Sequence, residues 1–229
     1  LIPAIIWRKQ TNAPNKFMGS GMLPAGAYVT LEHEMILVAR KGGRRMFKTR
    51  TEKENRRASA LFWEERNCWF SDVWTDLKGT RQALGNARGR KRSAAFPFEL
   101  AYRLICMYSV KGDWVLDPFL GTGTTTQAAM AAARNSRGFE LDPDLWDDAA
   151  LPGLVPFFQN RIRDRLSDHQ TFIRRRTVQQ KPVKHRNTPH GVRVVTAQEK
   201  DLTLDLPVRL TMTEPGKFKV SYRPEKLRG

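Results

Sequence analysis

The residues with the clearest chemical potential lie in a turn rich in glycine and threonine, within the segment WVLDPFLGTGTTTQAAM at Trp114–Met130. Gly121 and Gly123 permit a sharp turn that a ligand can approach closely, and the helix expected after them offers free N–H groups. Glu140 follows Asp117 by about 20 residues, at the end of the next expected strand, where a carboxylate can accept hydrogen bonds from both ribose hydroxyls. The pattern therefore predicts a nucleoside-binding site.

Two other kinds of glycine-rich site fit this turn less well. A phosphate-binding P-loop requires a lysine after the glycines, and Thr124 stands there instead. A dinucleotide fingerprint requires a third glycine where Thr126 stands. With these two kinds of site disfavoured, the pattern favours a nucleoside site of Rossmann type. Glu140 remains open to a second interpretation, as an ordinary strand-end carboxylate that pairs with an arginine such as Arg137.

The elements expected around the turn form a β-α-β unit. The segment DWVLDPF predicts a strand, TTTQAAMAAAR a helix whose threonine hydroxyls can cap free amides, and SRGFELD a second strand. Asp117 and Phe119 remain open to a structural interpretation, as a turn former and a core aromatic residue. Just upstream, PFELAYRLICMYS has apolar residues at a helical spacing and predicts an amphipathic helix.

Two further regions are expected to carry regular structure. Near the start, PAIIW and EHEMILVARK are rich in strand-forming residues, and a long loop rich in glycine, proline and asparagine joins them. Beyond the β-α-β unit, PGLVPFFQNRIRDRLSDHQTFIRRR predicts a helix with a basic face, and residues 174–176 are either a phosphate-binding cluster or a solvated helix end. The tail alternates like short strands, which predicts a hairpin.

The charge and the cysteine content restrict the class of protein. The chain has 229 residues, with 40 lysines and arginines against 23 aspartates and glutamates, so its formal net charge is +17. This charge predicts a polyanionic partner, and a surface kept soluble by basic residues is the alternative. Two cysteines without CxxC spacing argue against a disulfide framework and a zinc site, and they indicate a reducing, cytoplasmic setting. The four histidines form no metal-binding motif, and no apolar run approaches the length of a membrane span, so neither a metal nor a membrane is predicted.

The segment DPFLGTGTT resembles the cofactor motif DPFxGSGTT of amino-methylating DNA methyltransferases of the β group, with one conservative change at Thr122. The flanking segments AAFPFELAYRLI and RNSRGFELD resemble that family's FPxxLxxRLI segment, which lines the other side of the cofactor, and its strand ending in the ribose-binding acid. IIWRKQTNAPNKF and HEMILVARK resemble the pair of late strands before the target-recognition region. The resemblance covers residues 1 to about 145 and respects the family's permuted order.

The resemblance implies an α/β, Rossmann-like fold that binds S-adenosylmethionine, in permuted order, with a small target-recognition segment and a C-terminal appendage. It implies late strands and a loop of the catalytic region at 1–43, a target-recognition segment at 44–92 and a cofactor-binding region at 93–150. Beyond the resemblance, the residue pattern predicts a basic extension with helical and β-rich parts at 151–229. The implied cofactor-binding residues are Phe96, Pro97, Asp117, Pro118, Phe119, Gly121, Thr122, Gly123, Thr124 and Glu140. The candidate DNA-binding residues, whose cations would neutralise phosphates, are Lys9, Lys16, Arg44, Arg45, Arg88, Arg90, Lys91 and Arg92.

The family's chemistry depends on a (D/S/N)-P-P-(aromatic) motif, which holds the exocyclic amine and stacks on a flipped base. The chain contains no Pro-Pro dipeptide, so no catalytic residue is assigned. In the family's order the motif precedes AIIW, and this chain begins there, inside an apolar run and without a methionine. We therefore expect an upstream segment or a second chain to supply the motif, with its strands between WVLDPF and EMILVARK.

The resulting hypothesis is a site-specific DNA methyltransferase of a restriction-modification system, acting on N4 of cytosine or N6 of adenine in double-stranded DNA. Two alternatives remain open. One is a non-catalytic subunit that binds S-adenosylmethionine and DNA, and the other is an RNA methyltransferase, because net charge does not distinguish the two nucleic acids. The tryptophans between residues 44 and 92 are expected to form a small local core rather than platforms for stacked bases.

Overall fold

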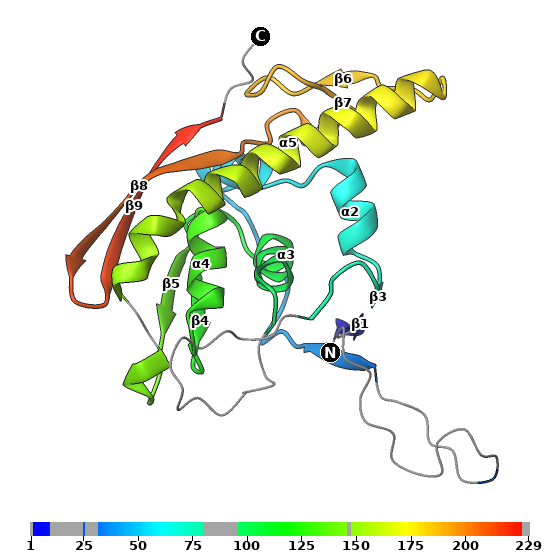
Figure 1. Ribbon diagram of the computed structural model, residues 1–229. Coiled ribbons are helices and arrows are strands. Elements are labelled where there is room, and N and C mark those ends of the chain that lie inside the picture. The colour runs from blue at the N-terminus through cyan, green and yellow to red at the C-terminus, as the bar shows by residue number, and fades with distance from the viewer. Residues whose placement is uncertain (1, 10–24, 26–31, 80–95, 146–147, 226–229) are drawn as a thin grey trace. The chain divides into compact units, whose positions relative to one another are not determined.

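The computed structural model describes residues 2–9, 25, 32–79, 96–145 and 148–225 (Figure 1). Its contacts divide the chain into two compact units, one formed by Leu1–Arg44 and Ser71–Leu100, the other by Arg45–Phe70 and Ala101–Gly229. Helices and strands both contribute, so the predicted mixed α/β class is confirmed. The regions predicted from the sequence were divided by function, whereas these units are defined by contacts, so the predicted boundaries stay predictions.

The first unit is built on a three-stranded sheet with the order β2-β1-β3. β1 (Ile2–Arg8) pairs antiparallel with β2 (His33–Val38) and parallel with the short β3 (Val73–Trp74). The side chains of Trp7 and Trp74 are buried, and the Trp7 indole donates to a backbone carbonyl at 2.8 Å. The two strands predicted near the start of the chain are confirmed, and most of the loop between them lies outside the described residues.

The second unit contains the predicted β-α-β unit, which is confirmed. β4 (Trp114–Asp117) and β5 (Asn135–Gly138) are parallel neighbours joined by α4 (Thr124–Ala131) (Figure 1). The N-cap of α4 is Gly123, in a left-handed conformation with φ of 80°, and no side chain caps the helix. The predicted cap by threonine hydroxyls is wrong, because Thr124 is already helical and a glycine occupies the cap position.

β4 and β2 belong to different sheets among the described strands. If β4 paired directly with β2, no further strands could lie between them, and the expected upstream or partner segment would have no place in the sheet. The described strands do not show such pairing. The expectation of an upstream or partner segment stays a prediction. One face of β4 carries apolar side chains in contact with solvent, since Trp114 and Leu116 are both largely exposed.

Two long helices belong largely or wholly to the second unit. α3 (Phe98–Tyr108) and α5 (Val155–Val178) confirm the helices predicted from the sequence, and Pro156 lies in the first turn of α5, where its missing N–H costs nothing. Figure 1 shows α5 running past α4. The buried residues of α4 include Ala128 and Ala129, whose small side chains allow neighbouring elements to approach closely.

Shorter elements complete the second unit. Its remaining helices and 3-10 turns are α1 (Arg50–Ala58), α2 (Trp63–Trp69), η1 (Pro143–Leu145), η2 (Asp148–Leu154) and η3 (Ala197–Glu199). β6 (His185–Arg186) pairs with β7 (Arg193–Val194), and β8 (Asp205–Glu214) pairs with β9 (Lys217–Pro224), both antiparallel. The hairpin predicted for the tail is confirmed. Among the described residues, no helix has both the length and the apolar composition needed to cross a membrane.

A buried arginine connects α2, α3 and α5. The guanidinium of Arg165 donates from Nε and Nη2 to the two carboxylate oxygens of Glu65, at 2.6 and 2.7 Å. Its Nη1 donates to the Tyr102 hydroxyl at 2.9 Å. The side chains of Arg165 and Glu65 are only 6% and 10% exposed, so the pair is shielded from water. Burial also raises the pKa of Tyr102 to about 12, so the phenol stays neutral beside this pair.

The tryptophans between residues 44 and 92 lie in or beside packed regions of their own units. Trp69 and Trp74 are 4% and 1% exposed, and the Arg165 guanidinium lies 5.5 Å from the centre of the Trp69 ring. The guanidinium of Arg176 lies 5.0 Å from the centre of the Trp63 ring. The burial of Trp69 and Trp74 agrees with the expected packing role, although the two residues belong to different units. Arg174 and Arg175 are exposed at the same helix end, and both interpretations of residues 174–176 stay predictions.

The buried ion pair leads to a stability prediction. Glu65→Gln should lower the free energy of unfolding by about 3–5 kcal/mol, because the Arg165 cation would keep its desolvation cost and lose its counter-charge. Glu54→Gln is the matched control, since Glu54 pairs with Arg50 on the exposed surface of α1, and it should cost about 0.3–0.5 kcal/mol. Urea unfolding of the whole chain at neutral pH measures both, and equal costs would contradict the role of the buried pair.

Candidate cofactor site

The glycine-rich turn lies between β4 and α4 and is fixed by backbone hydrogen bonds. Gly121 and Gly123 have φ values of 55° and 80°, in the left-handed region that glycine adopts without strain. The Gly123 N–H donates to the Leu120 carbonyl at 2.9 Å, and the Leu120 N–H donates to the Phe139 carbonyl at 2.8 Å. A Cβ added to Gly121 would meet no atom within 4 Å, so this side of the turn is open to a ligand.

Glu140 ties the turn to the end of β5. Its Oε2 accepts a hydrogen bond from the Gly121 N–H at 2.7 Å, and its Oε1 accepts from the N–H groups of Leu141 and Asp142 at 2.9 and 3.0 Å. The structure thus places the carboxylate directly against the glycine turn. Two carboxylate oxygens offer about four acceptor positions, so a ribose bound here would share them with these backbone donors.

Asp117 and Phe119 have different positions at the turn. The Asp117 Oδ1 accepts a hydrogen bond from the Phe119 N–H at 3.0 Å, which is the contact of a turn former. The Phe119 side chain is 87% exposed, so its alternative interpretation as a core aromatic residue is wrong. Leu141 and Phe139 are also exposed, and sequence reasoning missed both, although they flank Glu140 in the sequence. Such a cluster of exposed apolar side chains is typical of a surface that a ligand or another chain covers.

Most of the predicted cofactor-binding residues gather around this turn within the second unit. They are Asp117, Pro118, Phe119, Gly121, Thr122, Gly123, Thr124 and Glu140. Phe96 and Pro97 are half-buried and belong to the first unit, just before α3. Their role in closing the cofactor pocket stays a prediction.

Three of the predicted DNA-binding residues are described. Lys9 forms an ion pair with Glu34 at 2.7 Å, and Arg45 forms one with Asp113 at 2.5 Å that raises the pKa of Arg45. Arg44 is exposed. The two carboxylates offset part of the positive charge that Lys9 and Arg45 could offer to phosphates. The other predicted DNA-binding residues lie outside the described part of the chain, and they are Lys16, Arg88, Arg90, Lys91 and Arg92.

Comparison with known proteins identifies the family. Residues 1–150 match the N6/N4 methylase family, which is described as DNA methylase. The chain is 52% identical over 225 residues to the type II methyltransferase M.MthZI of Methanothermobacter thermautotrophicus. The aligned region covers 97% of this chain and 62% of that relative. The chain belongs to the N6/N4 DNA methylase family.

The resemblance inferred from the sequence is therefore confirmed. The type II methyltransferase M.MjaI of Methanocaldococcus jannaschii is 50% identical over 144 residues, which are 63% of the chain and 46% of that relative. One similar solved structure is of a Thermus thermophilus protein, which is named as a DNA modification methylase and is complexed with S-adenosyl-L-methionine. The two sequences are 38% identical, and the superposition has a TM-score of 0.48. The match covers 63% of this chain and 49% of that protein. The chain thus spans less than two thirds of the length of these relatives.

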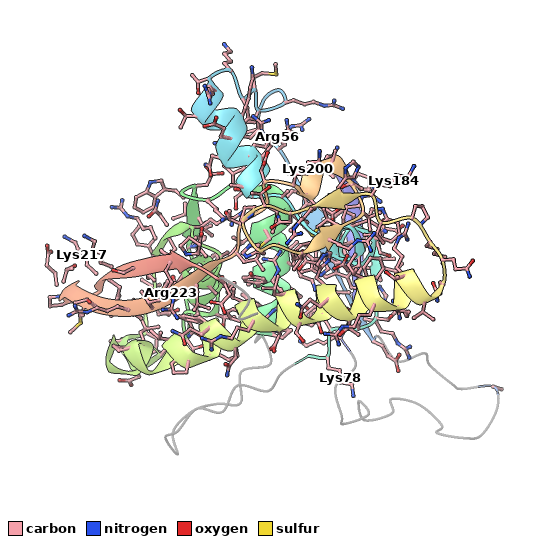
Figure 2. The ribbon with its side chains drawn as sticks, turned by 90° about the horizontal axis from the view of Figure 1, so that it is seen from above. Arg56, Lys78, Lys184, Lys200, Lys217 and Arg223 are labelled. Carbon is pink, nitrogen blue, oxygen red and sulfur yellow. The ribbon has the colours of Figure 1, made fainter. Side chains whose placement is uncertain are left out.

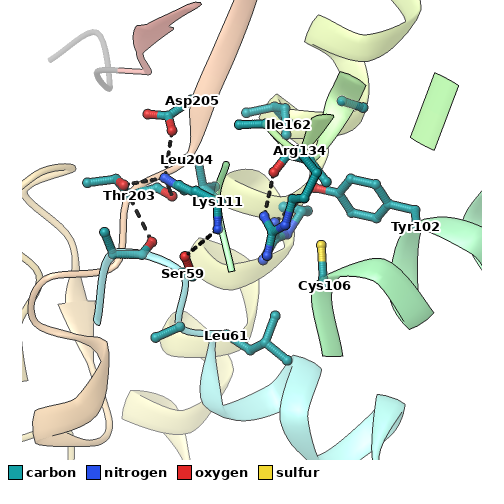
Figure 3. A pocket seen from close by; sticks show the side chains of 16 residues that line it. Ser59, Leu61, Tyr102, Cys106, Lys111, Arg134, Ile162, Thr203, Leu204 and Asp205 are labelled. Carbon is teal, nitrogen blue, oxygen red and sulfur yellow. Dashed lines mark hydrogen bonds and ion pairs between the residues drawn. The ribbon is translucent and has the colours of Figure 1, made fainter. Parts of the chain in front are cut away.

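A small cavity lies within the second unit, beside Lys111 and Asp205. It has a volume of about 20 Å³, which is room for about one water molecule. Figure 3 shows the Lys111 ammonium beside it, where Nζ lies 2.7 Å from the Asp205 carboxylate and donates to the Thr203 carbonyl at 2.7 Å. Burial lowers the pKa of Lys111, and Asp205 opposes that effect. A nucleoside does not fit this cavity. The candidate cofactor site is assigned to the open turn on its own geometry, in which the Glu140 carboxylate faces the Gly121 N–H.

A buried cluster of Glu64, His169 and Glu199 has the donor types of a metal site. The His169 Nδ1 lies 2.7 Å from the Glu64 Oε1, and its Nε2 lies 2.8 Å from the Arg193 carbonyl oxygen. Both partners are acceptors, so both ring nitrogens donate and the ring is an imidazolium. Burial alone lowers the pKa of His169, but the hydrogen bond and charge of Glu64 outweigh it and the pKa is raised. Because a metal requires an unprotonated ring nitrogen, this geometry favours an ion pair over a metal site.

The imidazolium leads to a pH prediction. Because the folded-state pKa of His169 lies above its ordinary value of 6.5, its stabilising contribution is complete below that pH and is lost as the pH rises through the folded-state pKa. The difference in free energy of unfolding between wild type and His169→Gln should therefore shrink between about pH 6 and pH 9. Glu64→Gln should show the same trend, since it removes the other half of the pair. Differences that stay constant across this range would show that His169 is neutral.

Proposed function

We propose that the protein is an S-adenosylmethionine-dependent DNA methyltransferase, which methylates N4 of cytosine or N6 of adenine at specific sites. The observation that carries the proposal is the Glu140 carboxylate held 2.7 Å from the Gly121 N–H, at an open glycine turn in a chain of the N6/N4 DNA methylase family. The finer fold assignment is a Rossmann-like fold in permuted order. It is supported by the antiparallel β1–β2 pair, which precedes the parallel β4-α4-β5 unit along the chain.

The groups around the turn fit the adenosine part of S-adenosylmethionine. The Glu140 oxygens can accept hydrogen bonds from the ribose hydroxyls. The exposed side chains of Phe119 and Leu141 offer apolar surface for a flat base. The absence of a side chain on Gly121 leaves space on the same turn. These three properties distinguish the turn from the water-sized cavity in the same unit.

The cofactor, when bound, supplies a methyl group on a sulfonium centre that an exocyclic amine attacks. The residues of this chain bind and orient it, and alignment of the amine with the methyl–sulfonium bond provides most of the rate. The chain contains no Pro-Pro dipeptide and therefore no (D/S/N)-P-P-(aromatic) motif. We assign methyl transfer to the whole protein, with the amine-binding motif contributed by another segment or a second chain.

Double-stranded DNA is the proposed partner, in the cytoplasm and within a restriction-modification system. The net charge of +17 and the membership of a DNA methylase family support DNA as the substrate. The two cysteines lie far apart in the sequence without CxxC spacing, which fits a reducing compartment.

The first test concerns the open side of the turn. Gly121→Val should weaken binding of S-adenosylmethionine by more than about tenfold, because its side chain would project into the space proposed for the cofactor. Gly112→Val is the matched control, since Gly112 also has a positive φ of 79° and open space around its Cβ, but lies before β4. Isothermal titration calorimetry on the 229-residue chain measures both. Equal losses would attribute the effect to backbone strain and contradict the proposed pocket.

The second test concerns the ribose. Glu140→Ala should weaken binding of S-adenosylmethionine by about 10- to 100-fold, because hydrogen bonds to a charged group contribute about 1.5–3 kcal/mol. Glu140→Gln keeps one acceptor oxygen and should fall between the alanine variant and the wild type. Thermal unfolding of the cofactor-free variants separates the loss of the turn's own hydrogen bonds from the loss of ribose contacts.

The outcomes of these titrations separate the alternatives. Unchanged affinity in a folded Glu140→Ala variant would refute the ribose role. If wild type binds the cofactor but transfers no methyl group to duplex DNA, the amine-binding residues lie outside this chain or the chain is a non-catalytic subunit. If wild type does not bind the cofactor, the turn is not a sufficient cofactor site.

A further inference from the structure

The C-terminal hairpin of β8 and β9 has one basic, exposed face. Along β9, exposed residues alternate with half-buried ones. On β8, Arg209 is directly opposite Ser221, and Thr211 is directly opposite Lys219. Directly opposed residues of an antiparallel pair project on the same side, so the two strands share this face. We call it the ribbon face, and its residues are Arg209, Thr211, Glu214, Lys217, Lys219, Ser221 and Arg223. Glu214 is directly opposite Lys217, and Arg223 continues the alternation of β9 opposite the buried Leu206, beyond a register shift in β8.

The other face of the hairpin is fastened to the second unit. The Tyr222 hydroxyl donates to the Met130 carbonyl in α4 at 2.7 Å. The Gln159 side chain in α5 donates to the Pro207 carbonyl at 2.9 Å. Leu210 is buried on the same side. The ribbon face is therefore presented by a hairpin attached to the unit that contains the glycine turn.

Most cations of the ribbon face are available to an external anion. Lys217 pairs with Glu214 at 2.6 Å, and both side chains are more than half exposed. In the part of the chain that the structure describes, Arg209, Lys219 and Arg223 form no ion pair. These three cations differ in this respect from Arg45, which is held by a carboxylate.

We propose that the ribbon face binds double-stranded DNA, as a contact surface separate from the cofactor turn and from the predicted recognition segment. The inference rests on the proposed DNA methyltransferase function and assigns a role to the C-terminal extension. A two-stranded ribbon fits the major groove, which is about 12 Å wide. Alternate residues on a strand recur at about 7 Å, about twice the 3.4 Å axial rise per phosphate of one DNA strand, so successive cations can meet every second phosphate.

The residues of the ribbon face are suited to two kinds of DNA contact, with phosphates and with base edges. Lys219 and Arg223 are suited to phosphate contacts, which provide affinity that falls with salt. Near the middle of the ribbon, Arg209 and the hydroxyls of Thr211 and Ser221 can reach base edges in the groove.

Exposed lysines on open strands have a second possible role. They prevent edge-to-edge pairing with other chains, because a charged side chain opposes the approach of another strand. That role predicts no effect of the ribbon face on DNA affinity, so a DNA-binding measurement distinguishes the two.

The test compares two triple variants with the same change in charge. The ribbon variant carries Arg209→Ala, Lys219→Ala and Arg223→Ala. The control variant carries Lys181→Ala, Lys184→Ala and Lys200→Ala, all at exposed positions. In Figure 2, Lys184 and Lys200 lie in a different part of the second unit from Lys217 and Arg223. Fluorescence anisotropy with a labelled DNA duplex at several salt concentrations measures affinity, and calorimetry measures binding of S-adenosylmethionine.

The ribbon variant should bind duplex DNA at least about tenfold more weakly than wild type near 0.1 M salt. The plot of log K against log salt has a negative slope, and the magnitude of that slope should decrease by about 2–3 in this variant, since each phosphate contact contributes about 0.9. The control should change the slope by less than about 1. Binding of S-adenosylmethionine should be unchanged in both. If thermal unfolding shows that the triple variant does not fold, Lys219→Glu provides the same test with one exposed side chain.

The outcomes separate this inference from the proposed function. Wild type that binds duplex DNA, with an unchanged affinity and slope in the ribbon variant, would overturn the ribbon face alone. Equal losses in the ribbon and control variants would also overturn it, since only net charge would matter. Wild type that does not bind duplex DNA would overturn both the ribbon face and the proposed function. Preference of wild type for duplex RNA would overturn DNA as the partner.

Discussion

The bidentate contact between Arg165 and Glu65 is the interaction on which the packing of the second unit depends. A guanidinium and a carboxylate withdrawn from water each lose several kcal/mol of hydration, and only close, well-directed hydrogen bonds compensate for this loss. Here both carboxylate oxygens accept from Arg165, and the Tyr102 hydroxyl accepts a third hydrogen bond. These directional requirements fix how α2, α3 and α5 pack. An apolar contact of the same area would not impose them.

Buried polar groups also attach the C-terminal extension, and two histidines do so in opposite protonation states. His169 donates from both nitrogens to acceptors and is charged. The His190 Nδ1 lies 2.6 Å from the Glu225 carbonyl oxygen, while its Nε2 accepts from the Leu204 N–H at 2.8 Å, which requires a neutral ring. Burial lowers the pKa of His190, in agreement with that neutral state. Because each ring fits only one pattern of donors and acceptors, the extension has a defined arrangement despite its short strands.

Local periodicity explains which parts of the fold could be predicted. α3 has an apolar pattern with the period of a helix, and β9 alternates with the period of a strand. The β-α-β unit was predictable from its glycine turn, which stands between an apolar strand and an alanine-rich helix, because β5 itself (Asn135–Gly138) has no apolar side chain. The contact between Arg165 and Glu65 joins residues 100 positions apart and leaves no trace in a local pattern. The local pattern alone would bury Phe119, because an aromatic residue after an apolar run resembles a core residue. Only the family resemblance placed it at the cofactor turn, where its side chain is exposed. The backbone contacts of Glu140 depend on the conformation of Gly121, which the sequence permits but does not specify.

The candidate cofactor site and the ribbon face are related through one short helix. α4 begins at the glycine turn, and the carbonyl of Met130 near its other end accepts the hydrogen bond from Tyr222 of the hairpin. Eight helical residues span about 12 Å, and a helix packed on both strand and helix neighbours does not stretch. The distance between the turn and the base of the hairpin is therefore set by α4 and not by a flexible connection. Under the proposed function, the cofactor must be held at a fixed depth relative to the groove from which the base is extruded, and a rigid connection of this kind satisfies that requirement.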